Sequence, residues 1–96
     1  MVLETAYFKL LPGKVDEFVA VLPTALQNVD GADGFLGAEI QRGIERADTV
    51  LVTLKWRALE DHTVGFRESD RFPKWRAIIS PFFAEPPVVE HWEIAD

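Results

Sequence analysis

The segment from Thr49 to Arg57 alternates in polarity more regularly than any other part of the chain, and this alternation limits the possible folds. Its apolar side chains recur at every second position: Val50, Val52, Leu54 and Trp56. The positions between them are mixed and hold Thr49, Leu51, Thr53 and Lys55. Because successive side chains of a β-strand point to opposite faces, this strand has one dry face and one mixed face. The dry face needs a layer of other elements to cover it.

A segment spanning residues 14–30 has apolar residues at spacings of three and four, which is typical of an amphipathic helix. Its apolar stripe consists of Val15, Phe18, Val19, Leu22, Ala25, Leu26 and Val29. Pro23 lies within this segment. Because proline has no backbone N–H to donate, we expect Pro23 to kink or divide the helix.

A second helical segment follows Trp56 in two pieces. One face of the first piece carries Leu59, His62, Phe66 and Ser69. The second piece presents Phe72, Trp75, Ile79 and Phe82. Asp70 stands directly before this second piece, at a position typical of an N-cap.

Three further strands are expected at about residues 3–11, 35–43 and 88–95, each bounded by glycine or proline. The resulting order β-α-β-β-α-β within 96 residues indicates a ferredoxin-like α+β fold. In this fold both helices cover one face of a four-stranded antiparallel sheet. The chain is therefore predicted to be a single domain over residues 1–96.

The other face of such a sheet has no helical cover. We expect it to be too apolar for a fully wetted surface, with Leu3, Thr5, Tyr7, Leu51, Thr53, Val89 and His91 among its residues. An apolar sheet face is typical of a self-complementary contact between two copies. The sequence therefore predicts a homodimer formed through sheet faces.

Charge and composition exclude several classes of partner. Ten Lys and Arg against sixteen Asp and Glu give a net charge of −6, which repels a phosphate backbone, so no nucleic-acid partner is expected. The absence of cysteine excludes disulfides and thiolate metal sites. No window approaches the roughly 18 apolar residues of a membrane span, and no basic segment with a long apolar run opens the chain. We therefore expect a cytoplasmic protein without a membrane partner.

The end of the regular strand and the helical segment after it carry a recognisable pattern: Trp56, Glu60, His62, Phe66, Ser69 and Phe72. It resembles the sequence Trp-x-Ser-x-Glu-Ala-His with following spaced aromatics that occurs in the antibiotic biosynthesis monooxygenase family of dimeric α/β barrels. Two glycine-containing stretches, residues 12–14 and 34–37, resemble the same family. Ala58 and Asp61 depart from the pattern, since the family often has Ser and Ala at these positions.

This resemblance implies a cofactor-independent monooxygenase that oxidises a small aromatic or quinone-like molecule. Such chemistry needs a base and hydrogen-bond donors in a dry cavity. His62 is the expected base, because the ordinary imidazole pKa of about 6.5 lies near neutral pH. Trp56 is expected to donate its indole N–H to a substrate oxygen. The expected aromatic wall of the substrate site comprises Tyr7, Phe66, Phe72, Trp75, Phe82 and Phe83.

Other interpretations of the same residues stay open. Trp56 and the aromatic residues also fit a packed core, and His62 fits a partly buried structural histidine. A non-catalytic dimeric module that binds a small molecule, or an accessory protein, fits the sequence as well. A haem-degrading oxygenase is a third possibility, but the single Asn, Asn28, lies in the first helix and His62 stands early in the second. The two histidines have no spaced carboxylate motif, so no metal site is predicted.

Overall fold

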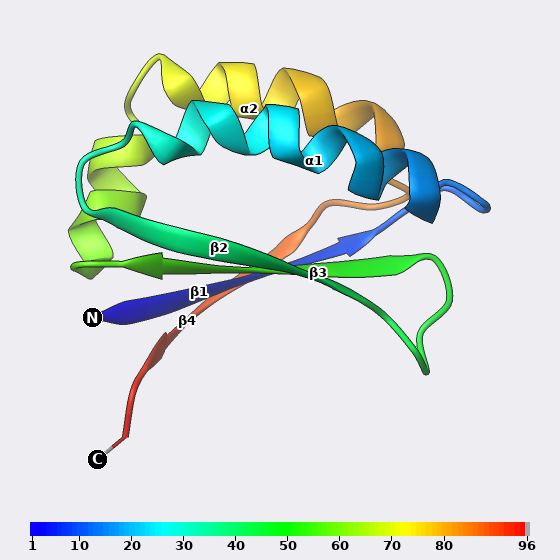
Figure 1. Ribbon diagram of the computed structural model, residues 1–96, viewed down its shortest axis with the longest axis horizontal. Helices are drawn as coiled ribbons and strands as arrows, with labels where there is room; N and C mark the ends of the chain where they lie inside the picture. The colour runs from blue at the N-terminus through cyan, green and yellow to red at the C-terminus, as the bar shows by residue number, and fades with distance from the viewer. Residues whose placement is uncertain (96) are drawn as a thin grey trace.

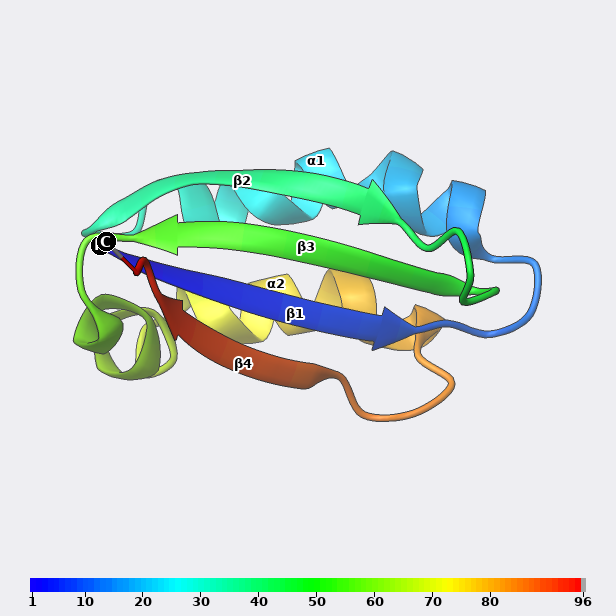
Figure 2. The same ribbon diagram turned by 90° about the horizontal axis from the view of Figure 1, so that it is seen from below.

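The computed structural model describes residues 1–95 and confirms the predicted order of elements. The order is β1 (Val2–Lys9), α1 (Val15–Asp30), β2 (Phe35–Arg42), β3 (Thr49–Trp56), the π-helical segment η1 (Asp61–Phe66), α2 (Arg71–Ile79), the short 3-10 helix η2 (Ser80–Phe82) and β4 (Val88–Glu93). The strands form an antiparallel sheet in the order β2-β3-β1-β4. Both helices lie over one face of this sheet (Figure 1), and the view onto the other face shows the strands uncovered (Figure 2). The ferredoxin-like fold class is confirmed.

The core lies between the sheet and the two helices. The dry face of β3 is buried as its alternation predicts, and Val50, Val52 and Trp56 are 0% exposed. The matching stripe on α1 is buried against it through Phe18, Leu22, Ala25 and Val29. Removal of this apolar surface from water is the main stabilising contribution to the fold. No helix within residues 1–95 is long and apolar enough to cross a membrane.

Helix α1 is one helix from Val15 to Asp30, so the expected division at Pro23 is wrong. Leu22, directly before Pro23, and Ala25, two residues after it, are both 0% exposed. A proline inside a helix removes one backbone hydrogen bond. Burial of the apolar stripe on both sides of Pro23 outweighs that loss.

The segment before α2 differs from the expected α-helix because its turns are wider. The backbone N–H of Arg67 donates to the carbonyl of His62, five residues back, at 3.1 Å. The start of α2 also differs, since Asp70 makes no side-chain capping hydrogen bond. Ser69 serves this end of the helix instead: its Oγ accepts the N–H of Arg71 at 3.2 Å and donates to the carbonyl of Phe66 at 2.6 Å.

The orientation of β4 corrects one prediction about the sheet. Val89 pairs with Ala6 and His91 pairs with Glu4, and residues paired across two strands point to the same face. Ala6 and Glu4 are buried under the helices. Val89 and His91 therefore lie on the helix-covered face, and their predicted place on the open face is wrong.

A tight junction fixes η1 against the start of β2. Gly34 has a φ of +83°, and a Cβ at this position would overlap the side chain of Asp61. The Asp61 carboxylate accepts the backbone N–H of Ala58 at 3.1 Å and pairs with Arg57 at 3.0 Å. Asp61 thus binds back to the N–H of Ala58, which is the reciprocal half of a capping box and does not require a Ser at position 58. Because His62 is the next residue, this junction also sets the position of the His62 ring.

Candidate active site

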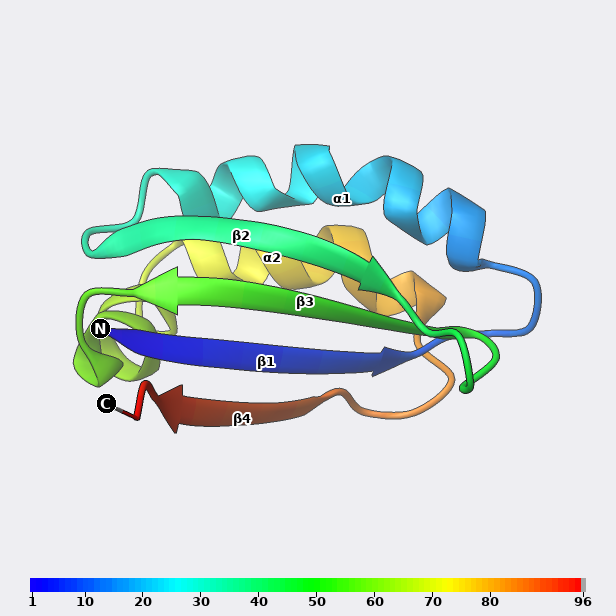
Figure 3. The same ribbon diagram turned by 60° about the horizontal axis from the view of Figure 1, so that its bottom comes forward.

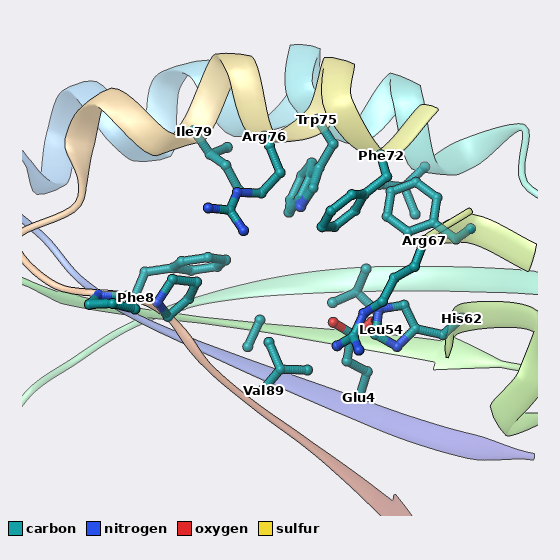
Figure 4. A pocket seen from close by; sticks show the side chains of 15 residues that line it. Glu4, Phe8, Leu54, His62, Arg67, Phe72, Trp75, Arg76, Ile79 and Val89 are labelled. Carbon is teal, nitrogen blue, oxygen red and sulfur yellow. Dashed lines mark ion pairs between the residues drawn. The ribbon is translucent and has the colours of Figure 1, made fainter. Parts of the chain in front are cut away.

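A cavity of about 420 Å³ lies between the sheet and the second helical segment. Its apolar lining includes Phe8, Phe66, Phe72, Trp75 and Ile79, and its polar lining consists of Glu4, His62, Arg67 and Arg76. Figure 4 shows α2 contributing Phe72, Trp75 and Arg76 from one side, while Glu4 and Val89 rise from the sheet on the other. The cavity is thus mainly aromatic and apolar, with few charged groups, as is typical of small-molecule sites.

The structure brings together half of the aromatic wall expected from the sequence. Phe66, Phe72 and Trp75 line the cavity. Tyr7 pairs with Leu51 and Val88 and lies on the open face of the sheet, outside this cavity.

Phe82 and Phe83 also lie outside the cavity lining, but they support it from behind. The Phe82 ring packs edge-on against Phe18, with the ring centroids 5.5 Å apart. The Phe83 ring stacks on Phe8 at 5.4 Å, with an angle of 17° between the planes. The Phe8 ring is therefore held by Phe83 while it forms part of the wall.

Trp56 is 0% exposed and does not line the cavity. Its indole N–H donates to Oε1 of Glu4 at 2.9 Å. The imidazole of His62 stacks on the indole ring, with centroids 5.3 Å apart and 26° between the planes. Trp56 therefore holds the carboxyl and the imidazole in place, where the sequence suggested a direct contact to substrate.

Glu4 is the central polar group of this site, although the sequence analysis did not select it. Its side chain is buried, with the residue 5% exposed, and one carboxyl oxygen lies 3.4 Å from Nε2 of His62. Burial raises the pKa of the Glu4 carboxyl to about 7, because a carboxylate loses its hydration there. The hydrogen bond from Trp56 and the positive charge of Arg67 oppose this shift only in part.

His62 is as deeply buried as Glu4, at 3% exposure, and its Nδ1 lies 2.8 Å from Nε2 of His91. Burial lowers the pKa of His62 to about 3, and the nearby charge of Arg67 and the ring of His91 act in the same direction. The pKa of His91 is also lowered, by burial and by Arg67. The His62 contact with Glu4 would be an ion pair only if His62 were protonated, and burial opposes that. We therefore describe it as a contact of a neutral imidazole.

This arrangement can remove a proton from a weak acid. A carboxyl with a pKa near 7 is half ionised at neutral pH, where it can accept a proton. Arg67 lines the same end of the cavity, and Figure 4 shows its side chain reaching toward Glu4 and His62. Its guanidinium can stabilise the anion that proton removal leaves on a substrate. Of the two groups, Glu4 has the pKa closer to neutral, whereas the pKa of His62, the base expected from the sequence, is lowered.

Neither ring nitrogen of His62 is presented to the cavity as a metal ligand, because Nε2 faces Glu4 and Nδ1 faces His91. Within residues 1–95, no group of three His, Asp or Glu side chains is placed to hold a metal ion. The histidine that a haem-iron interpretation would use is therefore already engaged by protein groups.

The signal for Glu4 was present in the sequence. Glu4, Ala6 and Phe8 stand at every second position of β1. Their side chains therefore point to the same face, and a charged residue stands on the face that is otherwise apolar. A buried carboxyl of this kind is a candidate for a shifted pKa. Arg67 gave no such signal, because its place in the cavity depends on the wide turn of η1.

Comparison with known proteins places this site in a family context. Residues 1–78 match the family model described as antibiotic biosynthesis monooxygenase. The uncharacterized protein YczJ of Bacillus subtilis strain 168 is 31% identical over 93 residues, which cover 97% of this chain and 98% of YczJ.

Two solved structures illustrate the likeness of fold. A candidate antibiotic biosynthesis monooxygenase from Bordetella bronchiseptica superposes with a TM-score of 0.93 at 31% identity, covering 98% of this chain and 96% of that one. SnoaB, a cofactor-independent oxygenase from Streptomyces nogalater, superposes with a TM-score of 0.80 at 10% identity, covering 99% and 93% of the two chains. The second likeness, at this low identity, shows the fold alone.

Substitution of Glu4 by Gln should make the stability of the protein less sensitive to a rise in pH from 4.5 to 7. The folded carboxyl has a pKa of about 7 against an ordinary value of 4.5, so between these values the folded chain holds a proton that the unfolded chain has lost. The contribution of Glu4 to the free energy of unfolding therefore falls as pH rises from 4.5 to 7, by on the order of 3 kcal/mol. Urea unfolding should show Glu4→Gln gaining about this much relative to the wild type between pH 4.5 and pH 8.

The lowered pKa of His62 has the opposite effect, because it reduces the free energy of unfolding as pH falls below 6.5. His62 is present in both the wild type and Glu4→Gln, so its contribution largely cancels when the two proteins are compared. Glu68→Gln is the matched control, since Glu68 is exposed between η1 and α2 and lies off the open face of the sheet. We expect the control to differ from the wild type by less than about 0.5 kcal/mol at either pH. A Glu4→Gln difference that does not grow with pH would refute the shifted pKa.

Proposed function

Because the chain belongs to the antibiotic biosynthesis monooxygenase family, we propose that it oxidises a small aromatic or quinone-like molecule with dioxygen and without a cofactor. The observation that carries this proposal is the Glu4 carboxyl, which is buried at the end of an apolar cavity and has a pKa of about 7. Deprotonation is the step that such a reaction requires of the protein.

The proposed reaction converts a methylene group beside an aromatic ketone or phenol into a carbonyl group. Loss of a proton from this carbon gives a carbanion whose charge is delocalised onto oxygen. The anion gives one electron to dioxygen, the resulting radicals combine, and protonation yields a hydroperoxide. Loss of water from the hydroperoxide leaves the new carbonyl group. One oxygen atom enters the product and the other leaves as water, so the substrate supplies all the electrons.

In this proposal Glu4 accepts the proton from the substrate carbon. Arg67, at the same end of the cavity, stabilises the delocalised anion. The aromatic wall of Phe66, Phe72 and Trp75 excludes water and holds a planar ring. The protein thus supplies a base, an anion site and a dry cavity, which is what cofactor-free chemistry needs.

Two histidines offer a path for the proton from Glu4 to solvent. His62 contacts Glu4 through Nε2 at 3.4 Å and His91 through Nδ1 at 2.8 Å. His91 lines a separate surface depression together with Leu59 and Trp92. The two rings therefore connect the cavity to the surface. We assign His62 to proton transfer behind the base, in which Nε2 accepts a proton from Glu4 while Nδ1 gives one to His91, so that the ring stays neutral.

Oxygen uptake with a hydroxylated anthrone as substrate tests the proposal. The rate should rise with pH through about 7, as the Glu4 carboxyl ionises. Glu4→Gln should lower the rate by about a hundredfold or more, because general-base catalysis contributes on that order. Trp56→Phe removes a hydrogen bond that lowers the Glu4 pKa, so the midpoint of its pH profile should move upward. His62→Ala should slow turnover without removing the pH dependence.

Glu68→Gln again serves as the control and should retain the wild-type rate. Binding of the anthrone without any oxygen uptake would favour the non-catalytic module and exclude the proposed function. A Glu4→Gln variant with wild-type turnover would remove Glu4 from the mechanism.

We also propose that the protein is a homodimer joined through the open face of the sheet, as proteins of this fold family typically are dimeric. This face carries Trp92, which is 49% exposed, and Val88, which is 54% exposed. Tyr7 on β1 pairs with Val88 on one side and with Leu51 of β3 on the other, so these side chains lie on the same face. Figure 3 shows this face unobstructed by helices. Exposed apolar area of this kind is typical of an interface.

Light scattering coupled to size-exclusion chromatography should give a mass of about 22 kDa, twice the 10.9 kDa of one chain. Leu51→Glu places a charge on the open face and should convert the particle to a monomer. Val64→Glu is the control, since Val64 is 50% exposed on η1 and does not line the depression that contains Trp92. A wild-type particle near 11 kDa would rule out the proposed dimer.

A further inference from the structure

The wide turn of η1 is anchored by a side chain at each of its ends. At the start, the Asp61 carboxylate accepts the backbone N–H of Ala58 at 3.1 Å and occupies the space that a Cβ at position 34 would need. Near the end, Ser69 Oγ donates to the carbonyl of Phe66 at 2.6 Å and accepts the first backbone N–H of α2 at 3.2 Å. The segment is therefore held between two fixed points.

The width of this turn decides which side chains face the cavity. The backbone N–H of Arg67 donates to the carbonyl of His62, five residues back, at 3.1 Å, so the two residues lie on the same side of the segment. In an α-helix successive residues are about 100° apart around the axis, and residues five apart would diverge by about 140°. A regular helix would therefore turn His62 or Arg67 away from Glu4. Figure 4 shows both side chains beside Glu4.

The contacts of Asp61 are more than an ion pair on the surface. Its side chain is 17% exposed, against 91% for Asp33, the other carboxylate that pairs with Arg57. The backbone N–H of Arg57 donates to the carbonyl of Gly34 at 2.8 Å. The end of β3, the chain before β2 and the start of η1 therefore meet at the Asp61 carboxylate, and Gly34 provides the space for it.

We propose that Asp61 is a positioning residue, which holds η1 in its wide-turn form so that His62 and Arg67 reach Glu4 together. Without this anchor the segment can take regular α-helical turns, which are far commoner than π turns, and the two side chains separate. Asp61 does not line the cavity, so it acts only through the residues that it positions. The inference rests on the proposed function, since the site that Asp61 orders is the one assigned to proton removal.

The ring of His62 reports on this position without any oxidation. Burial and the nearby Arg67 and His91 hold the pKa of His62 at about 3, against an ordinary value of 6.5. In Asp61→Ala the ring leaves these surroundings, its charged form is penalised less, and its pKa should rise toward 6.5. Ring NMR should then show His62 gaining a proton above about pH 4, where the wild-type ring stays neutral. The chain has two histidines, so the signals are assigned by their absence in His62→Ala.

Oxygen uptake with the hydroxylated anthrone should follow the position of the ring. Asp61→Ala should lower the turnover number by about tenfold to a hundredfold, because small misplacements of catalytic groups have effects of that order. Asp61→Asn keeps a side-chain oxygen that can accept the N–H of Ala58, so it should retain the wild-type titration of His62 and most of the turnover. A residue that only stabilised the fold would lower the urea midpoint and leave the His62 titration unchanged.

Asp33→Ala is the matched control, because it removes the other partner of Arg57, 3.4 Å away, and leaves the contact between Asp61 and Ala58 intact. It should match the wild type in His62 titration and in turnover. If Asp61→Ala does not fold, Gly34→Ala tests the same anchor, since its Cβ would overlap the Asp61 carboxylate. The proposal is overturned if the folded variant leaves His62 neutral above pH 4, or if Asp33→Ala changes the titration as much.

The positioning role and the oxygenase function fail separately. If Asp61→Ala moves the His62 titration but no protein, wild type included, consumes oxygen, the proposed oxygenase function fails and the positioning role stands. If the wild type oxidises the anthrone and Asp61→Ala keeps both its rate and its His62 titration, the oxygenase function stands and Asp61 has no positioning role.

Discussion

A carboxyl buried in an apolar layer is the constraint around which this molecule is organised. Glu4 lies on the dry face of β1 between residues that form the core, where an isolated carboxylate would be costly. Among residues 1–95, only the indole N–H of Trp56 is within a short hydrogen-bond distance of it, at 2.9 Å. Burial therefore dominates, and the carboxyl keeps its proton up to about pH 7. The buried carboxyl that makes the fold less stable as pH rises toward 7 is therefore also the group that gives the cavity a usable base.

The elements around Glu4 differ from regular structure where they serve this carboxyl. The wide turn of η1 places His62 against Glu4 and Arg67 beside the cavity. The Gly34 and Asp61 junction fixes that turn to the sheet, because a side chain at position 34 would displace Asp61. The π-helical geometry of η1 is often found at functional sites. Local irregularity and candidate chemistry thus occur in the same stretch of chain.

The fold followed from the sequence because its signals are local and repeated, as in the alternation of β3 and the apolar stripe of α1. The site followed only in part. Apolar residues occur on both faces of β4, with Val88 and Trp92 on one and Val89 on the other. The pattern therefore did not indicate which face His91 would occupy. Burial raises the pKa of Glu4, and Trp56 and Arg67, both more than fifty positions away in the chain, lower it only in part. Contacts of that kind appear only when the sheet has formed.

The central claim is that Glu4 ionises near neutral pH beside a neutral His62. Carbon NMR of protein labelled at glutamate Cδ tests it most directly, with the Glu4 signal assigned by its absence in Glu4→Gln. We expect this signal to titrate with a midpoint of about 7 while the His62 ring gains no proton above about pH 4. A midpoint near 4.5, or a protonated His62 paired with ionised Glu4 at pH 6, would contradict the account.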